Sequence, residues 1–100
     1  MVKALLLLIP PGRTVSYKVL ADLLKISPRL IGRLMSLNDE PIIIPCHRVI
    51  RSDGRIGGYS LKGGAKFKVK LLLWEGVKIK SNRRIDEKYM LNMEEFMEAF

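Results

Sequence analysis

Residues 16–36 hold two short helical patterns in close succession, and this arrangement restricts the fold more than any other feature of the sequence. In the first pattern, Ser16 can cap a helix whose apolar residues recur at helical spacing until Lys25. In the second, Ser27 can serve as the N-cap, and Pro28 suits the first helical position, where no backbone N–H is needed. Two short helices joined by a turn of about three residues predict a helix-turn-helix.

The second of these helices is amphipathic, and its two faces differ in chemistry. Its inward stripe is predicted to contain the apolar residues Leu30, Ile31, Leu34 and Met35. The opposite face carries two arginines and two small residues, namely Arg29, Gly32, Arg33 and Ser36. Small residues permit close approach to another surface, and arginines reach phosphates or bases. This face is typical of a DNA-reading helix, although a helical hairpin with solvated arginines would show the same pattern.

Basic charge is concentrated in the first 85 residues. They hold 17 Lys or Arg against five acidic residues, whereas residues 86–100 hold five acids and only Lys88. A field of this sign attracts phosphate polyanions, but it is also common on well-solvated basic surfaces. Charge therefore allows nucleic-acid binding without deciding it, and the acidic tail is a poor DNA contact.

Helical patterns also occur near both ends of the chain. Residues 3–9 form an apolar stretch that Pro10 and Pro11 should end, because a proline pair removes backbone donors. Residues 65–75 predict the last strong helix, with Gly76 just past its end and three residues facing inward: Phe67, Leu71 and Trp74. After a possible short strand at 77–80, Asn92 can cap a final amphipathic segment.

The middle of the chain predicts extended structure. Ile42, Ile43 and Ile44 form a β-branched run that suits a short buried extended segment. Residues 49–56, with Asp53-Gly54 at the turn, predict a small β-hairpin. We therefore expect a mainly α fold with a small β-hairpin, of the winged-helix-like helix-turn-helix DNA-binding class.

Cys46 and His47 are the only cysteine and the only histidine in the sequence. A cysteine is nucleophilic as its thiolate, and an adjacent histidine base is a common way to generate one. Neighbours in extended structure point in opposite directions, so a bend at Pro45 or a bridging water is needed for proton transfer. A buried cysteine beside a hydrogen-bonded core histidine is the structural alternative.

The segment Ile44-Pro45-Cys46-His47-Arg48-Val49 resembles the active-site signature of the O6-alkylguanine-DNA alkyltransferases, also called methylated-DNA-protein-cysteine methyltransferases. Further matches follow in the family's order: Ser16-Tyr17, Ser27-Pro28-Arg29, Gly32, Asn38, Gly57-Gly58-Tyr59-Ser60 and Glu75-Gly76. The resemblance covers the family's C-terminal catalytic and DNA-binding domain. It implies a domain at residues 1–80 and a C-terminal tail at residues 81–100, packed on that domain.

The resemblance implies a role for each residue of a thiol relay. Cys46 corresponds to the alkyl acceptor, His47 to the base that removes the thiol proton through a water, and Glu75 to the carboxylate that orients the histidine. Asn38 corresponds to the residue that holds the turn before the active-site segment. Lys68 aligns with a lysine near the acceptor, where its charge favours the thiolate.

It also implies how DNA is bound. The helix-turn-helix binds the minor groove, and the damaged nucleotide is flipped into a pocket. Arg29 corresponds to the arginine that fills the gap in the duplex, beside Gly32, Arg33 and Ser36 on the same helix. Tyr17 corresponds to a donor to the guanine ring nitrogen. The other pocket residues implied are Val49, Ser60, Tyr59 and Met35.

The resemblance implies single-turnover transfer of an O6-alkyl group from guanine in double-stranded DNA to Cys46. We expect no cofactor, no metal, no membrane association, a monomer, and a location in the cytoplasm or at the nucleoid. The main alternative is a non-catalytic alkyltransferase-like protein that binds alkylated DNA and recruits other repair factors; such proteins lack the acceptor cysteine. A helix-turn-helix regulator leaves Cys46, His47 and Glu75 without a role, and a thiol hydrolase or redox protein leaves the DNA-facing helix unexplained.

Overall fold

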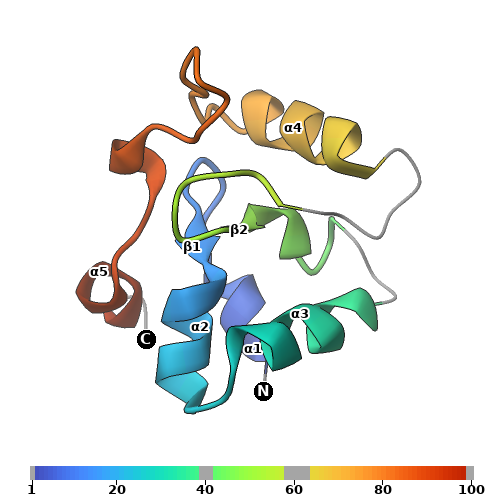
Figure 1. Ribbon diagram of the computed structural model, residues 1–100, viewed down its shortest axis with the longest axis vertical. Coiled ribbons are helices and arrows are strands. Elements are labelled where there is room, and N and C mark those ends of the chain that lie inside the picture. The colour runs from blue at the N-terminus through green and yellow to red at the C-terminus, as the bar shows by residue number, and fades with distance from the viewer. Residues whose placement is uncertain (1, 39–41, 58–63, 99–100) are drawn as a thin grey trace.

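The computed structural model describes residues 2–38, 42–57 and 64–98 (Figure 1). In chain order its elements are α1 (Val2–Leu7), β1 (Val15–Ser16), α2 (Tyr17–Leu24), α3 (Pro28–Ser36), the 3₁₀ turn η1 (Cys46–Arg48), β2 (Val49–Ile50), α4 (Gly64–Trp74), the 3₁₀ turn η2 (Glu87–Tyr89) and α5 (Met93–Met97). Figure 1 shows α1, α2 and α3 gathered on one side of the two short strands, with α4 on the other side. Within the described ranges, no helix has the length and apolar character needed to cross a bilayer.

The predicted helix-turn-helix is confirmed, and its helices begin where the sequence indicates. Ser16 Oγ accepts a hydrogen bond from the Val19 N–H, and Ser27 Oγ accepts one from the Leu30 N–H, each at 3.1 Å. These are N-caps, which satisfy backbone donors that a helix leaves unpaired at its start. Lys25 ends α2 in the left-handed conformation, with φ 57°. Local capping chemistry therefore sets the angle at which α3 leaves α2.

The strand pairing differs from the predicted hairpin. β2 pairs with β1 in parallel, with Val15 opposite Val49 and Ser16 opposite Ile50. The turn at Asp53-Gly54 does form, because Gly54 adopts φ +88° and its N–H donates to the Arg51 carbonyl. The turn is closed by the Arg55 carbonyl, which accepts from the Arg51 N–H at 2.9 Å, but Arg55 then pairs with Arg84 and no strand after the turn pairs with β2 in the described residues. The mainly helical class is confirmed. The turn predicted at residues 49–56 forms without a second strand beside β2.

Several apolar residues predicted to face inward are exposed. On α3, Ile31 and Met35 are buried, but Leu30 and Leu34 are 39% and 38% exposed, so the helix contacts the body along a narrow edge. Trp74 is 83% exposed, because α4 buries the face that contains Lys68, Leu71 and Leu72.

The segment that leads to the cysteine also differs from its prediction. Ile42 and Ile43 lie in an exposed turn, with Ile42 at φ 75°, and only Ile44 of the three is buried. Cys46 and His47 then lie in the η1 turn rather than in an extended segment. The strand predicted at residues 77–80 is reduced to one antiparallel bridge, between Ile79 and Ile85.

Two buried clusters form the core. The larger joins α1, α2 and α3 to the strands and includes Leu6, Leu20, Ile31 and Cys46. The smaller contains Ile50, Leu72, Val77 and Ile85, and it holds α4 against β2.

The last residues of the described chain pack on the larger cluster. Asn92 caps α5 in a reciprocal capping box with Glu95, as its position in the sequence indicates. Phe96 has no exposed surface and belongs to the larger cluster. The segment before α5 is tied down by the Thr14 carbonyl, which accepts from the Leu91 N–H at 2.8 Å. This segment therefore closes one side of the core.

Replacing Phe96 with alanine should lower the free energy of unfolding by about 3–5 kcal/mol, because a fully buried aromatic side chain leaves a cavity. Its neighbour Met97 is 48% exposed and provides the matched control, for which Met97→Ala should cost less than about 1 kcal/mol. Urea unfolding of both variants measures the difference. Equal losses would show that α5 does not anchor through Phe96.

Candidate functional site

Cys46 is held at the junction of the helix-turn-helix and the strands. Its side chain is 3% exposed, and its N–H donates to the Ile44 carbonyl at 2.8 Å. Asn38, just beyond α3, donates from Nδ2 to the same carbonyl at 3.0 Å. The end of α3 is thereby tied to the segment that presents the cysteine. The parallel pairing of β1 with β2 brings Tyr17, the first residue of α2, beside this segment.

His47 is fully buried and contacts Glu75 from the end of α4. Its Nε2 lies 3.1 Å from Glu75 Oε1. Its other ring nitrogen, Nδ1, is also buried and makes no hydrogen bond to the described residues. Burial lowers the pKa of His47, and the charges of Arg48 and Lys68 lower it further, although Glu75 opposes them. The geometry therefore favours a neutral imidazole with one nitrogen fixed and the other open to a proton.

Arg48 completes this arrangement, although its place in the sequence motif by itself predicts no role for it. Its Nε lies 3.0 and 3.2 Å from the two Glu75 oxygens, its Nη2 bonds Oε2, and its Nη1 donates to the Ile9 carbonyl at 2.7 Å. Burial by itself raises the pKa of Glu75, but the hydrogen bonds and charges of Arg48 and His47 outweigh that effect and lower it. The sequence does contain a signal for this contact. Arg48 lies between Pro45, which is buried, and the apolar pair Val49-Ile50, and an arginine in a buried segment usually pairs with an acidic residue.

Lys68 and Tyr17 lie on the thiol side of this cluster. Lys68 is fully buried on α4, and its Nζ donates to the Val49 carbonyl at 2.7 Å. Burial lowers its pKa to about 8, while the charge of a Cys46 thiolate would raise it. The pKa of Tyr17 is raised by burial and also by a charge on Cys46. A negative charge on the Cys46 sulfur therefore interacts electrostatically with the Tyr17 phenol and with the Lys68 ammonium.

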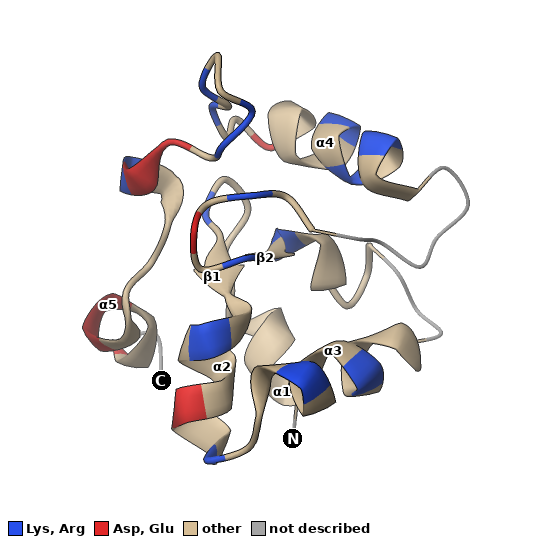
Figure 2. Cartoon of the chain, viewed as in Figure 1, with Lys and Arg blue, Asp and Glu red and all other residues tan. Residues whose placement is uncertain are grey.

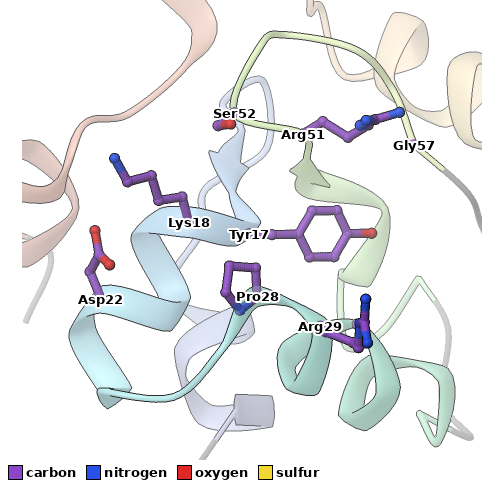
Figure 3. A pocket seen from close by; sticks show the side chains of 9 residues that line it. Tyr17, Lys18, Asp22, Pro28, Arg29, Arg51, Ser52 and Gly57 are labelled. Atoms are coloured by element: carbon purple, nitrogen blue, oxygen red, sulfur yellow. The ribbon is translucent and has the colours of Figure 1, made fainter.

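A pocket of about 790 Å³ opens beside these residues (Figure 3). Figure 3 shows Tyr17 near its centre, Arg29 of α3 on one side and Arg51 on the other. Gly32 and Gly57 also line it. A Cβ at Gly32 would meet no atom within 4 Å, so α3 presents open space there.

Three further predicted site residues, Arg33, Met35 and Ser36, do not line this pocket. Met35 is buried in the core cluster that contains Cys46. Arg33 and Ser36 are exposed on α3, where Ser36 Oγ donates to the Arg33 carbonyl at 2.6 Å. Tyr59 and Ser60 lie outside the described residues. No group of three or more His, Cys, Asp or Glu side chains in the described parts of the chain could hold a metal ion.

The comparisons with known proteins agree with this geometry. Residues 1–77 match the family model described as "6-O-methylguanine DNA methyltransferase, DNA binding domain". A methylated-DNA–protein-cysteine methyltransferase of Pyrobaculum aerophilum is 51% identical over 71 residues, which are 71% of this chain and 47% of that protein. One from Methanothermobacter thermautotrophicus is 49% identical over 71 residues, 39% of its length. The chain therefore spans less than half the length of these relatives.

Two solved structures extend the comparison. The OGT of Mycobacterium tuberculosis in complex with DNA has a TM-score of 0.68 and 41% identity, covering 74% of this chain and 46% of that one. Atl1 of S. pombe, in complex with damaged DNA containing O6-carboxymethylguanine, has a TM-score of 0.67 and 26% identity, covering 84% of both chains. Since the family model matches most of the sequence, the chain belongs to the family of 6-O-methylguanine DNA methyltransferase DNA-binding domains.

Proposed function

We propose that this protein repairs DNA by transferring the O6-alkyl group of a guanine irreversibly to Cys46. The observation that carries the proposal is the chain of contacts around the cysteine, in which buried His47 is fixed through Nε2 by Glu75 and keeps Nδ1 open. This is the arrangement that a histidine base needs beside a thiol. The family membership and the DNA complexes of similar proteins support the substrate.

In the proposed reaction His47 takes the thiol proton through a water, and Glu75 holds the imidazole in place. The Cys46 sulfur then attacks the alkyl carbon, a carbon–sulfur bond forms, and the bond between that carbon and O6 breaks. The electron pair stays on the purine, and a proton on a ring nitrogen restores guanine. Tyr17 is the proposed donor to that nitrogen, and Lys68 stabilises the negative sulfur before the attack. The product is a stable thioether, so each molecule reacts once.

The pocket next to Tyr17 is the proposed binding site for the flipped guanine. The Val49 carbonyl, Tyr59 and Ser60 are the further residues proposed to complete this binding site. Met35 is proposed to support it from the core cluster that it shares with Cys46, and Asn38 holds the segment that leads to it. α3 enters the minor groove, where Arg29 replaces the extruded base.

Gly32 and Ser36 allow α3 to approach the groove closely, and Arg33 contacts the backbone. The proposed catalytic and DNA-binding domain is residues 1–80. We further propose that the protein acts as a monomer, in the cytoplasm or at the nucleoid.

Incubation with a duplex that carries O6-methylguanine should raise the mass of the intact protein by one methylene group. Cys46→Ala should show no increase, while it still binds the methylated duplex, because the pocket and α3 are unchanged. Mass spectrometry and a binding titration measure both properties. If the wild-type mass stays constant while binding persists, the chain is an alkyltransferase-like binding protein and the transfer proposal is wrong.

The rate of transfer should depend on pH through His47. Its pKa lies below the ordinary value of 6.5, so the imidazole is a competent base at neutral pH. The single-turnover rate should be flat near neutrality and should fall about tenfold per pH unit once the pH drops below that lowered pKa. A rate that keeps rising steeply from pH 7 to pH 9 would contradict His47 as the base.

Changes at Arg48 should separate its charge from its geometry. Arg48→Met removes a positive charge that lowers the pKa of His47, so the acid limb of the pH–rate profile should move to higher pH. Arg48→Lys keeps the charge but loses the two-pronged contact with Glu75. Its acid limb should stay in place while its rate falls about 10-fold or more. Identical pH profiles for wild type and Arg48→Met would show that Arg48 has only a structural role.

A further inference from the structure

A basic hairpin at residues 78–86 lies beyond the part of the chain that matches the family model. Its arms are joined by the antiparallel bridge of Ile79 with Ile85, and the Asp86 N–H donates to the Lys78 carbonyl at 3.0 Å. At its tip the Lys80 N–H donates to the Arg84 carbonyl at 2.8 Å, and Arg83 adopts the left-handed φ of 64°. The segment is therefore a defined turn that presents basic side chains.

The hairpin is anchored against the turn that follows β2. Ile85 is buried, and its N–H donates to the Gly54 carbonyl at 2.8 Å. Arg84 pairs with Arg55 across an antiparallel bridge. A Cβ at Gly54 would lie 3.4 Å from Arg84 Cβ, an ordinary contact distance, so the φ of +88° and not a lack of space favours glycine at this position. These contacts bring a segment more than 20 residues distant in sequence beside the loop that begins at Arg51.

The anchoring concentrates positive charge on one surface. Like charges placed directly opposite in paired strands repel, and here Arg55 faces Arg84. The pKa of Asp53 is lowered by a backbone hydrogen bond from Arg55 and by the charges of the neighbouring arginines, Arg51, Arg55 and Arg84. Asp53 thus lies among three guanidinium groups, and Glu87, which lines the adjoining groove, lies 4.0 Å from Lys80 Nζ.

A groove between α4 and the hairpin extends this surface. It has a volume of about 530 Å³, and its charged lining residues are Lys66 and Lys70 from α4 and Arg83 from the hairpin. No acidic residue lines it within the described part of the chain. Figure 2 shows the basic residues of α4, of the turn after β2 and of the hairpin gathered at the end of the molecule opposite α1.

We propose that the hairpin and the adjoining turn form a second contact for the phosphate backbone of DNA, through Arg55, Arg83 and Arg84. This inference rests on the proposed function, because Arg51 joins the surface to the pocket beside Tyr17 and Arg29. The molecule measures 33 Å along its longest axis, comparable to about ten base pairs of duplex at 3.4 Å per step. One duplex can therefore contact α3 and the hairpin together.

The test measures how binding to an O6-methylguanine duplex changes with salt concentration. The slope of log K against log salt is negative, and each lost phosphate contact reduces its magnitude by about 0.9, so Arg83→Gln with Arg84→Gln should make it less steep by about 2. The paired change of both residues to lysine keeps the charge and should retain the wild-type slope. Lys3→Gln, an exposed site on α1, is the control for a charge lost elsewhere and should also leave the slope unchanged. Thermal unfolding confirms that each variant is folded.

The outcomes separate this inference from the proposed function. Failure of the wild-type protein to bind the methylated duplex would reject the repair function and this surface together. Binding without a gain in mass would reject the transfer alone, and the salt slopes would still decide whether the second contact exists. Wild-type transfer with equal salt slopes for the glutamine and lysine pairs would reject the second contact alone. A glutamine pair that weakens binding to an acidic peptide or to RNA, with an unchanged DNA slope, would also overturn it.

Discussion

The Glu75 carboxylate connects the parts of the molecule on which the candidate site depends. It comes from the residue just past α4, and it binds His47 and Arg48 of η1 at the same time. Arg48 also bonds the Ile9 carbonyl, so the contact reaches the end of the segment that contains α1. A carboxylate shared by a guanidinium and an imidazole has little freedom to move. The backbone that carries Cys46, next to His47 and Arg48, is therefore held in a fixed position.

The contacts among Glu75, His47 and Arg48 also affect the protonation state of His47. A carboxylate next to a histidine raises its pKa, so by itself it would leave a larger fraction of the imidazole already protonated and unable to accept the thiol proton. Here burial and Arg48 act in the opposite direction, and the pKa of His47 is lowered overall. Lys68 remains close to the thiol with a pKa of about 8, so part of its population is neutral near that pH. The site combines a neutral imidazole with one cation, Lys68, that interacts with a charge on the Cys46 sulfur, and this combination favours a thiolate.

Local chemistry in the sequence predicted the helices well, and long-range pairing explains what it could not predict. The N-caps at Ser16, Ser27 and Asn92 depend on contacts within four residues, and all three form. The parallel pairing of β1 with β2 joins residues more than 30 positions apart and has no local signal, so the Asp53-Gly54 turn was assigned to a hairpin. Trp74 was placed inward because it follows the helical period, but the buried face of α4 is rotated towards Lys68.

In the site, too, the sequence motif indicates which residues take part, whereas their contacts depend on how distant segments pack. Cys46, His47 and Glu75 were indicated by a motif, and the structure places His47 and Glu75 in contact. Arg48 lies inside that motif, yet its contact with Glu75 depends on how α4 docks and cannot be read from adjacent residues. The pocket residue Arg51 was missed for the same reason, since it lines the pocket only because β2 directs the chain past Tyr17.

The most direct test of the central claim is a crystal structure of the wild-type protein after reaction with a duplex that contains O6-methylguanine. The account predicts a methyl group on Cys46 Sγ and a restored guanine in the pocket between Tyr17 and Arg29. An unmodified thiol with intact O6-methylguanine held in the same pocket would contradict it, and would show that the protein recognises the lesion without removing it.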